Sequence, residues 1–107
     1  MTILREWRGR GVPANDDAVF EHYLTTLKPR LAASPGFEGS AFGRRDLGKL
    51  VEYVLISYWK DMDAVKTFAG PAVDKAVLPE GTSDVLLDSD TFVRHFEIVD
   101  KETRRAA

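Results

Sequence analysis

The chain has 107 residues, 44% of them hydrophobic and 30% charged, which is typical of one soluble globular domain spanning residues 1–107 with its core in residues 2–100. A net charge of −2 argues against nucleic acid as a partner, and the absence of cysteine excludes disulfides, thiolate metal sites and cysteine nucleophiles. No segment resembles a secretory signal or a membrane span, so we expect a cytoplasmic protein without a membrane partner.

A strand and a helix are predicted first. Side chains over residues 2–11 alternate in character with a period of two, which indicates a strand. Asn15, Asp16 or Asp17 can cap the following helix, because a short oxygen-bearing side chain accepts hydrogen bonds from the first helical amides. The stripe predicted to face the core consists of Val19, Phe20, Tyr23, Leu24, Leu27 and Leu31.

Pro29 lies inside this stripe. A proline in a helix removes a backbone donor and clashes with the preceding turn. We therefore expect a kink or restart near Lys28, and an end to the helix at residues 34–36.

A hairpin and a second helix follow. Residues 37–45 and 50–59 are predicted to form antiparallel strands joined by the short polar connection 46–49. Asp61 is expected to cap the next helix. The predicted buried side of that helix consists of Met62, Val65, Phe68 and Ala69.

The last third of the chain is less regular. Gly70 and Pro71 break the second helix, and we expect residues 72–77 to resume helically. Residues 83–90 are too short to classify by periodicity, whereas residues 91–99 are predicted to be the final strand. The tail, residues 101–107, is expected to fray.

The resulting order is strand, helix, strand, strand, helix, strand, which predicts an α+β, ferredoxin-like βαββαβ domain with both helices on one face of an antiparallel sheet. Both sheet faces nevertheless carry large apolar side chains, and an exposed patch of that kind is normally an interface. We therefore expect a homodimer formed through the uncovered sheet face. In the third strand the two faces consist of Val51, Tyr53, Leu55, Ser57 and Trp59 against Val54, Ile56 and Tyr58.

Three joined features carry a family resemblance: Pro35-Gly36-Phe37 before the second strand, VEYVLISYWKDMDAVKTF over residues 51–68, and VRHFEIV over residues 93–99. In this order and spacing they resemble the antibiotic biosynthesis monooxygenase superfamily. The resemblance implies a dimeric α+β barrel with a small-molecule pocket between sheet and helices.

The resemblance also implies a choice of functions. Similar proteins oxidise aromatic substrates with oxygen and no metal or flavin, degrade haem, or have no known activity. We expect a cofactor-independent, monooxygenase-like oxidoreductase acting on a small aromatic or enolic molecule. The alternatives are a non-catalytic small-molecule-binding or stress-related dimer and, third, a haem-binding or haem-degrading protein.

Six residues are candidates for the site. Trp59 corresponds to the family's pocket tryptophan, although a core anchor fits it equally well. The other predicted substrate contacts are Tyr53, which shares the face of Trp59, and Phe68 and Tyr23 from the helices. The predicted catalytic residues are Arg5, which can hold an anionic oxygen with its fork of donors, and His95, which can act as an acid or base near neutral pH.

Several expected residues are absent. Related oxygenases and haem degraders carry an asparagine in the first strand, at a position that falls at or beside Glu6, and residues 2–11 contain none. The haem degraders' axial histidine has no counterpart between Trp59 and His95. We expect no metal and no cofactor, and we expect His22 to be on the surface or satisfied locally.

Overall fold

The computed structural model describes residues 1–104; the remainder of the predicted tail, residues 105–107, lies outside the described part. Residues 101–104 form no helix or strand. The strands are β1 (Ile3–Gly11), β2 (Phe37–Asp46), β3 (Val51–Trp59), β4 (Asp88–Ser89) and β5 (Arg94–Glu97). The helices are α1 (Asp16–His22), α2 (Lys28–Ala32), α3 (Met62–Ala69) and α4 (Thr82–Val85), with a 3-10 turn at Pro13–Asn15 and a π-helical turn at Tyr23–Leu27.

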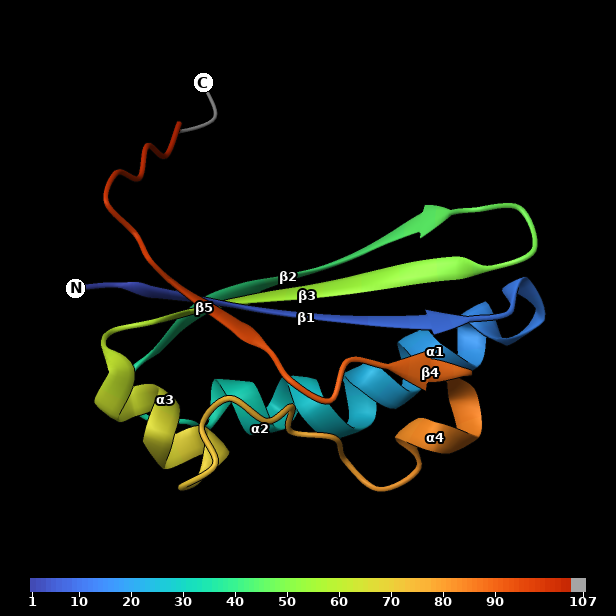
Figure 1. The fold of residues 1–107 in the computed structure, drawn as a ribbon, viewed down its shortest axis with the longest axis horizontal. Coiled ribbons are helices and arrows are strands. Elements are labelled where there is room, and N and C mark those ends of the chain that lie inside the picture. Colours follow the sequence, from blue (N-terminus) through green and yellow to red (C-terminus); the bar gives the residue numbers. More distant parts are fainter. Residues whose placement is uncertain (105–107) are drawn as a thin grey trace.

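The sheet confirms the predicted fold class. Its order is β2-β3-β1, and the short strands β4 and β5 both pair with the other edge of β1. The pairings among the described strands are antiparallel. All four α-helices lie on one side of this sheet, and the opposite face is uncovered (Figure 1). The domain is therefore α+β and ferredoxin-like. The final predicted strand, residues 91–99, is shortened to β5, and β4 forms in the segment of residues 83–90 that periodicity did not classify.

Strand β3 shows why the sheet packs on one side. Its odd-numbered residues, from Val51 to Trp59, are buried, whereas the even-numbered residues are only half-buried. A strand with a period of two places alternate side chains on opposite faces, so the odd set meets the helices. This confirms the predicted division of the strand into two faces. On the uncovered face, Phe96 of β5 is 50% exposed.

The first helical region contains the irregularity that Pro29 predicts. Helices α1 and α2 are joined by the π-helical turn, where the amide of Lys28 donates to the carbonyl of Tyr23 five residues earlier. The hydroxyl of Thr25 donates to the carbonyl of Glu21 at 2.9 Å. The helix therefore passes Pro29 through a wide turn instead of a sharp kink. Side-chain hydroxyls such as that of Thr25 help to satisfy the carbonyls of the residues around this turn.

Two details of this helix correct the sequence prediction. Asn15 makes no side-chain cap hydrogen bond, because the 3-10 turn leads directly into α1 and supplies the backbone geometry for its start. Phe20 is 54% exposed rather than part of the core-facing stripe. It lies beside Val19, which is buried, and the helix can turn only one of these neighbouring positions fully toward the sheet.

Helix α3 begins as predicted. Asp61 accepts a hydrogen bond from the amide of Ala64 at 2.9 Å, which satisfies one of the free donors at the helix start. The turn before β2 packs closely against this helix: a Cβ on Gly36, whose φ is +81°, would lie 2.5 Å from the Cβ of Ala64. Gly36 therefore lets strand β2 begin directly beside α3.

The segment of residues 70–81, called the strap below, connects α3 to α4. The prediction of a helix over residues 72–77 is wrong. The segment makes a single turn, in which the amide of Lys75 donates to the carbonyl of Ala72, and its other backbone bonds go to distant residues. The amide of Ala76 donates to the carbonyl of Thr91, and the amide of Val93 donates to that of Asp74.

None of the helices in residues 1–104 has the length and apolar character that a membrane span requires.

Candidate functional site

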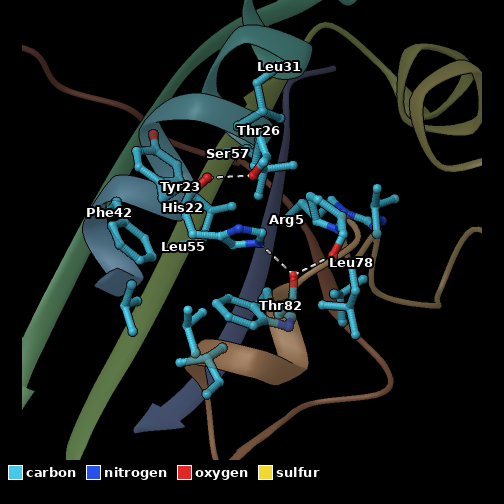
Figure 2. Close-up of a pocket in the computed structure, with 18 of the residues that line it drawn as sticks. Arg5, His22, Tyr23, Thr26, Leu31, Phe42, Leu55, Ser57, Leu78 and Thr82 are labelled. Carbon is cyan, nitrogen blue, oxygen red and sulfur yellow. Dashed lines mark hydrogen bonds between the residues drawn. The ribbon is translucent and has the colours of Figure 1, made fainter. Parts of the chain in front are cut away.

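A cavity lies between the helix-facing side of the sheet and the helices (Figure 2). Its volume is about 60 Å³. Because one water needs about 10–15 Å³ on this measure, this space has room for a few waters or a small organic group. The cavity is partly open to solvent, so a larger molecule bound there would extend out of it. Its walls come from strands β1, β2 and β3, the helical segment of residues 16–32, α3, the strap, α4, and residues 86 and 93. The polar or titratable side chains among these walls are Arg5, Trp7, His22, Tyr23, Thr26, Ser57 and Thr82, and the other lining residues are apolar.

The cavity lies where two core clusters meet. One cluster is centred on Trp59 and Leu31, and the other contains Val51 and Tyr53. Trp7 packs against both clusters. An apolar cavity with a few directed polar groups is the usual form of a small-molecule site.

Arg5 is the charged group in the cavity wall. It is only 5% exposed, and its Nη1 and Nη2 atoms donate to the strap carbonyls of Val73 and Lys75 at 2.8 and 2.9 Å. Burial lowers the pKa of Arg5 to about 10, while Asp74 opposes that shift, so the guanidinium remains charged at neutral pH. Arg5 therefore ties the strap to β1 and places a positive charge beside an apolar space.

His95 lies behind Arg5 and does not line the cavity. Its Nε2 is 2.8 Å from Nη1 of Arg5, and its Nδ1 is 3.3 Å from Oδ1 of Asp74. Because a guanidinium can only donate, Nε2 must accept and the ring proton belongs on Nδ1. Burial, then the charge of Arg5, lowers the pKa of His95, with Asp74 opposing. In this geometry His95 orients Arg5, and a direct catalytic role for it stays a prediction.

His22 does line the cavity, although the sequence interpretation placed it on the surface or in a local contact. Its ring points toward Thr82 in Figure 2, with Nε2 3.0 Å from the hydroxyl oxygen. Thr82 donates its own proton to the carbonyl of Pro79 at 2.7 Å, so its oxygen accepts from Nε2 of His22. With the proton of this bond on Nε2, Nδ1 of His22 is left without a hydrogen bond from the described residues.

The four predicted substrate contacts divide into two pairs. Tyr23 and Phe68 line the cavity. Trp59 and Tyr53 are buried behind the lining residues: Nε1 of Trp59 donates to the hydroxyl oxygen of Ser57 at 2.9 Å, and the Tyr53 hydroxyl donates to Asp16 at 2.6 Å. Burial, followed by that bond to Asp16, raises the pKa of Tyr53 to about 12. Ligand contact by Trp59 or Tyr53 stays a prediction, and in this structure both support the wall.

Sequence reasoning missed Trp7, His22 and Thr82 as cavity residues. One available signal was helical spacing, because Val19, His22 and Thr26 recur at intervals of three and four and so share a face. No comparable signal exists for Thr82, which reaches the cavity from a loop and a four-residue helix. Among the described residues, no cluster of three His, Asp or Glu side chains could hold a metal ion.

No family model matches the chain, and no curated protein matches its sequence. Solved structures do match. A proposed antibiotic biosynthesis monooxygenase from Bacillus cereus is 12% identical, with all of both chains covered and a TM-score of 0.71. SnoaB, a cofactor-independent oxygenase from Streptomyces nogalater, is 22% identical, with 94% of each chain covered and a TM-score of 0.55.

The haem degrader MhuD from Mycobacterium tuberculosis, with two haems bound in its active site, is also similar. It is 22% identical, with 94% of this chain and 99% of that chain covered and a TM-score of 0.58. These neighbours differ in activity, so the likeness identifies a shared architecture. The chain has the fold of the antibiotic biosynthesis monooxygenases, as its sequence motifs predicted.

Proposed function

We propose that the cavity binds a small, largely apolar aromatic or enolic molecule and promotes its oxidation by molecular oxygen without a metal or flavin. The observation that carries this proposal is the buried guanidinium of Arg5 in the wall of an apolar cavity. In a dry site a fixed positive charge stabilises a developing oxyanion far more than it does in water. The oxygenase SnoaB, which has this fold, supports the same class of chemistry.

The proposed reaction needs one base and one oxyanion partner. His22 removes a proton from an activated CH₂ group, and Arg5 stabilises the enolate or phenolate oxygen that results. The carbanion reduces O₂ and forms a carbon–oxygen bond, giving a hydroperoxide once His22 returns the proton. Loss of water then leaves a ketone, so that R₂CH₂ and O₂ become R₂C=O and H₂O.

A non-catalytic binding protein of the same fold is the second candidate. Three of the five N–H groups of Arg5 are already bonded to Val73, Lys75 and His95, which weakens its hold on a substrate oxygen. The first strand also lacks the asparagine found in related oxygenases. Both observations favour binding without turnover.

Haem binding ranks third. A cavity of about 60 Å³ is far too small for a porphyrin without rearrangement of the strap or helices. A haem titration is therefore expected to give no specific Soret shift.

Oxygen consumption and thermal shift together test these candidates. The purified protein is given a panel of anthrones, quinols and enols, and His22→Gln serves as the matched variant. The oxygenase proposal predicts a rise in melting temperature with at least one compound, oxygen uptake, and about 10²-fold slower uptake by the variant with binding retained. Binding without uptake would support the second candidate, and neither effect would contradict both.

We also propose that the protein is a homodimer formed through the uncovered sheet face. The charged end of this face is internally paired, with Glu52 within 3.7 Å of Arg8 and Arg10 and 2.7 Å from Arg45. Its other end is apolar and includes half-exposed Phe96. Light scattering at micromolar concentration is expected to give a dimer that Phe96→Glu dissociates and that Phe20→Glu, on the helix side, leaves intact. A monomeric wild-type protein would rule the dimer out.

A further inference from the structure

Trp7 carries a buried donor that nothing in the described chain satisfies. Its indole Nε1 is shielded from solvent and has no hydrogen-bond partner within residues 1–104. Most buried polar groups in native proteins are paired, so an unpaired one needs an explanation. Desolvation without a compensating acceptor opposes folding, and a bound molecule that supplies an acceptor would remove that penalty.

The position of Trp7 connects this donor to the cavity. Trp7 pairs with Leu55 in the sheet and lies two residues after Arg5, on the same helix-facing side of β1. It lines the cavity together with both of these residues. A ligand held beside Arg5 is therefore also beside the Trp7 ring. Nε1 itself has almost no accessible surface while the cavity is empty, so a ligand oxygen binds it only with a small rotation of the indole.

Gly9 leaves room for the Trp7 indole. A Cβ on Gly9 would be 2.7 Å from Cη2 and 2.9 Å from Cζ2 of Trp7, and 3.0 Å from Cδ1 of Leu86. These distances are shorter than normal contacts, so any larger residue at position 9 would displace the ring. The absence of a side chain at Gly9 therefore leaves the space into which the ring extends along the strand.

Trp59 provides the internal comparison. Its indole nitrogen has the same chemistry, but it donates to Ser57 at 2.9 Å. It is also fully buried and outside the cavity lining. The fold thus provides an acceptor for the tryptophan that only packs, and leaves without one the tryptophan that lines the cavity.

We propose that the Trp7 indole N–H is a specificity-determining donor that binds a carbonyl or phenolate oxygen of the cavity's ligand. This inference rests on the proposed small-molecule function and narrows it to ligands with an apolar ring and an acceptor oxygen. A hydrocarbon of the same shape fills the cavity but leaves the donor unpaired. Selectivity is strong in such a case, because a buried polar group of the site is left unsatisfied by the wrong ligand.

The test compares 1-indanone with indane, a ketone and a hydrocarbon of nearly equal shape. Dissociation constants are measured for the wild-type protein, for Trp7→Phe, which keeps an aromatic ring without the donor, and for Trp59→Phe as the matched control. The ratio of the indane constant to the indanone constant is expected to fall about tenfold in Trp7→Phe and to stay unchanged in Trp59→Phe. Gly9→Ala, which displaces the indole but keeps its N–H, is expected to lower the ratio as well.

The outcomes separate this inference from the function on which it rests. If both molecules bind and the ratio is the same in Trp7→Phe and Gly9→Ala as in the wild type, the acceptor is bound elsewhere and the inference is overturned while the binding function stands. If neither molecule binds the wild-type protein, the proposed function fails and the inference falls with it. If Trp7→Phe does not fold, the result for Gly9→Ala decides.

Discussion

The two tryptophans lie in two regions of the same sheet face, and these regions differ in how the indole is packed and hydrogen-bonded. Around Trp59 the packing is closed: the ring is fully buried, meets Phe37 edge to face and Phe68 at a tilt, and has an acceptor in Ser57. Around Trp7 the packing is open to a cavity, and the indole N–H is unpaired. The hydrogen bonding of the indole N–H therefore distinguishes the tryptophan enclosed in the core from the one that borders the cavity, although composition alone does not.

The largest expected difference between the two regions is in stability. Trp59→Ala is expected to lower the free energy of unfolding by ~3–5 kcal/mol, because a fully enclosed ring leaves a cavity that the surroundings cannot fill. Trp7→Ala is expected to cost less, about 1–2 kcal/mol, since the ring already borders a cavity and its N–H is unpaired. Urea unfolding of both variants measures the two values. Equal losses would contradict the distinction between the regions.

Arg5→Met is expected to have the next largest effect on stability, because it removes the hydrogen bonds that attach the strap to β1 beside the cavity. The carbonyls of Val73 and Lys75 lose their donors, and we expect a loss of about 2 kcal/mol. Amide exchange at Ala76 and Val93 should accelerate, because these amides hold the strap against residues 91–93. Arg30→Met is the control: Arg30 makes one 3.4 Å bond to a carbonyl, so exchange in the strap should not change.

Ser57→Ala makes the indole N–H of Trp59 an unpaired donor, like that of Trp7. The Trp59 N–H would lose its acceptor in a fully buried position, and we expect a cost of about 1–3 kcal/mol. Thermal or urea unfolding measures it, with Ser40→Ala as the control, because Ser40 of β2 pairs with Ser57 in register but makes no bond to Trp59. A neutral Ser57→Ala would show that pairing of the indole N–H has little energetic weight here.

The smallest expected effect is a pH dependence from His95. Its folded-state pKa is lowered, so below the ordinary value of about 6.5 the unfolded chain takes up a proton that the folded chain does not. Stability from this group is therefore fully present above about pH 6.5 and is lost as the pH falls toward the folded-state pKa. Melting temperature from pH 8 to pH 5 should fall less in His95→Gln than in the wild type. Identical profiles would contradict the assignment.

Local signals in the sequence were enough to predict most of the fold. The alternation in β3 predicted its buried face, Asp61 predicted the start of α3, and Pro29 predicted an irregular first helix. Residues 72–77 of the strap were predicted wrongly because their conformation depends on bonds to Arg5 and to residues 91–93, which are distant in sequence. Such tertiary contacts override local propensity and leave no local pattern.

The site was less predictable than the fold. Arg5, Tyr23 and Phe68 line the cavity, but Trp59, Tyr53 and His95 stand behind it. Whether a side chain forms the lining or supports it depends on distances of a few ångströms between elements, which a single sequence does not encode in any periodic way. The missing acceptor at Trp7 is of the same kind, because it becomes visible only when every neighbour of the indole is placed.

The chain contains two tryptophans, so an ¹H–¹⁵N spectrum has two indole signals, and Trp7→Phe assigns them. Titration with 1-indanone tests the central claim most directly. We predict that the Trp7 indole proton moves downfield, as expected for a new hydrogen bond, that the Trp59 signal stays in place, and that indane produces no comparable downfield shift. A ketone that binds without moving the Trp7 signal, or that moves only the Trp59 signal, would contradict the account.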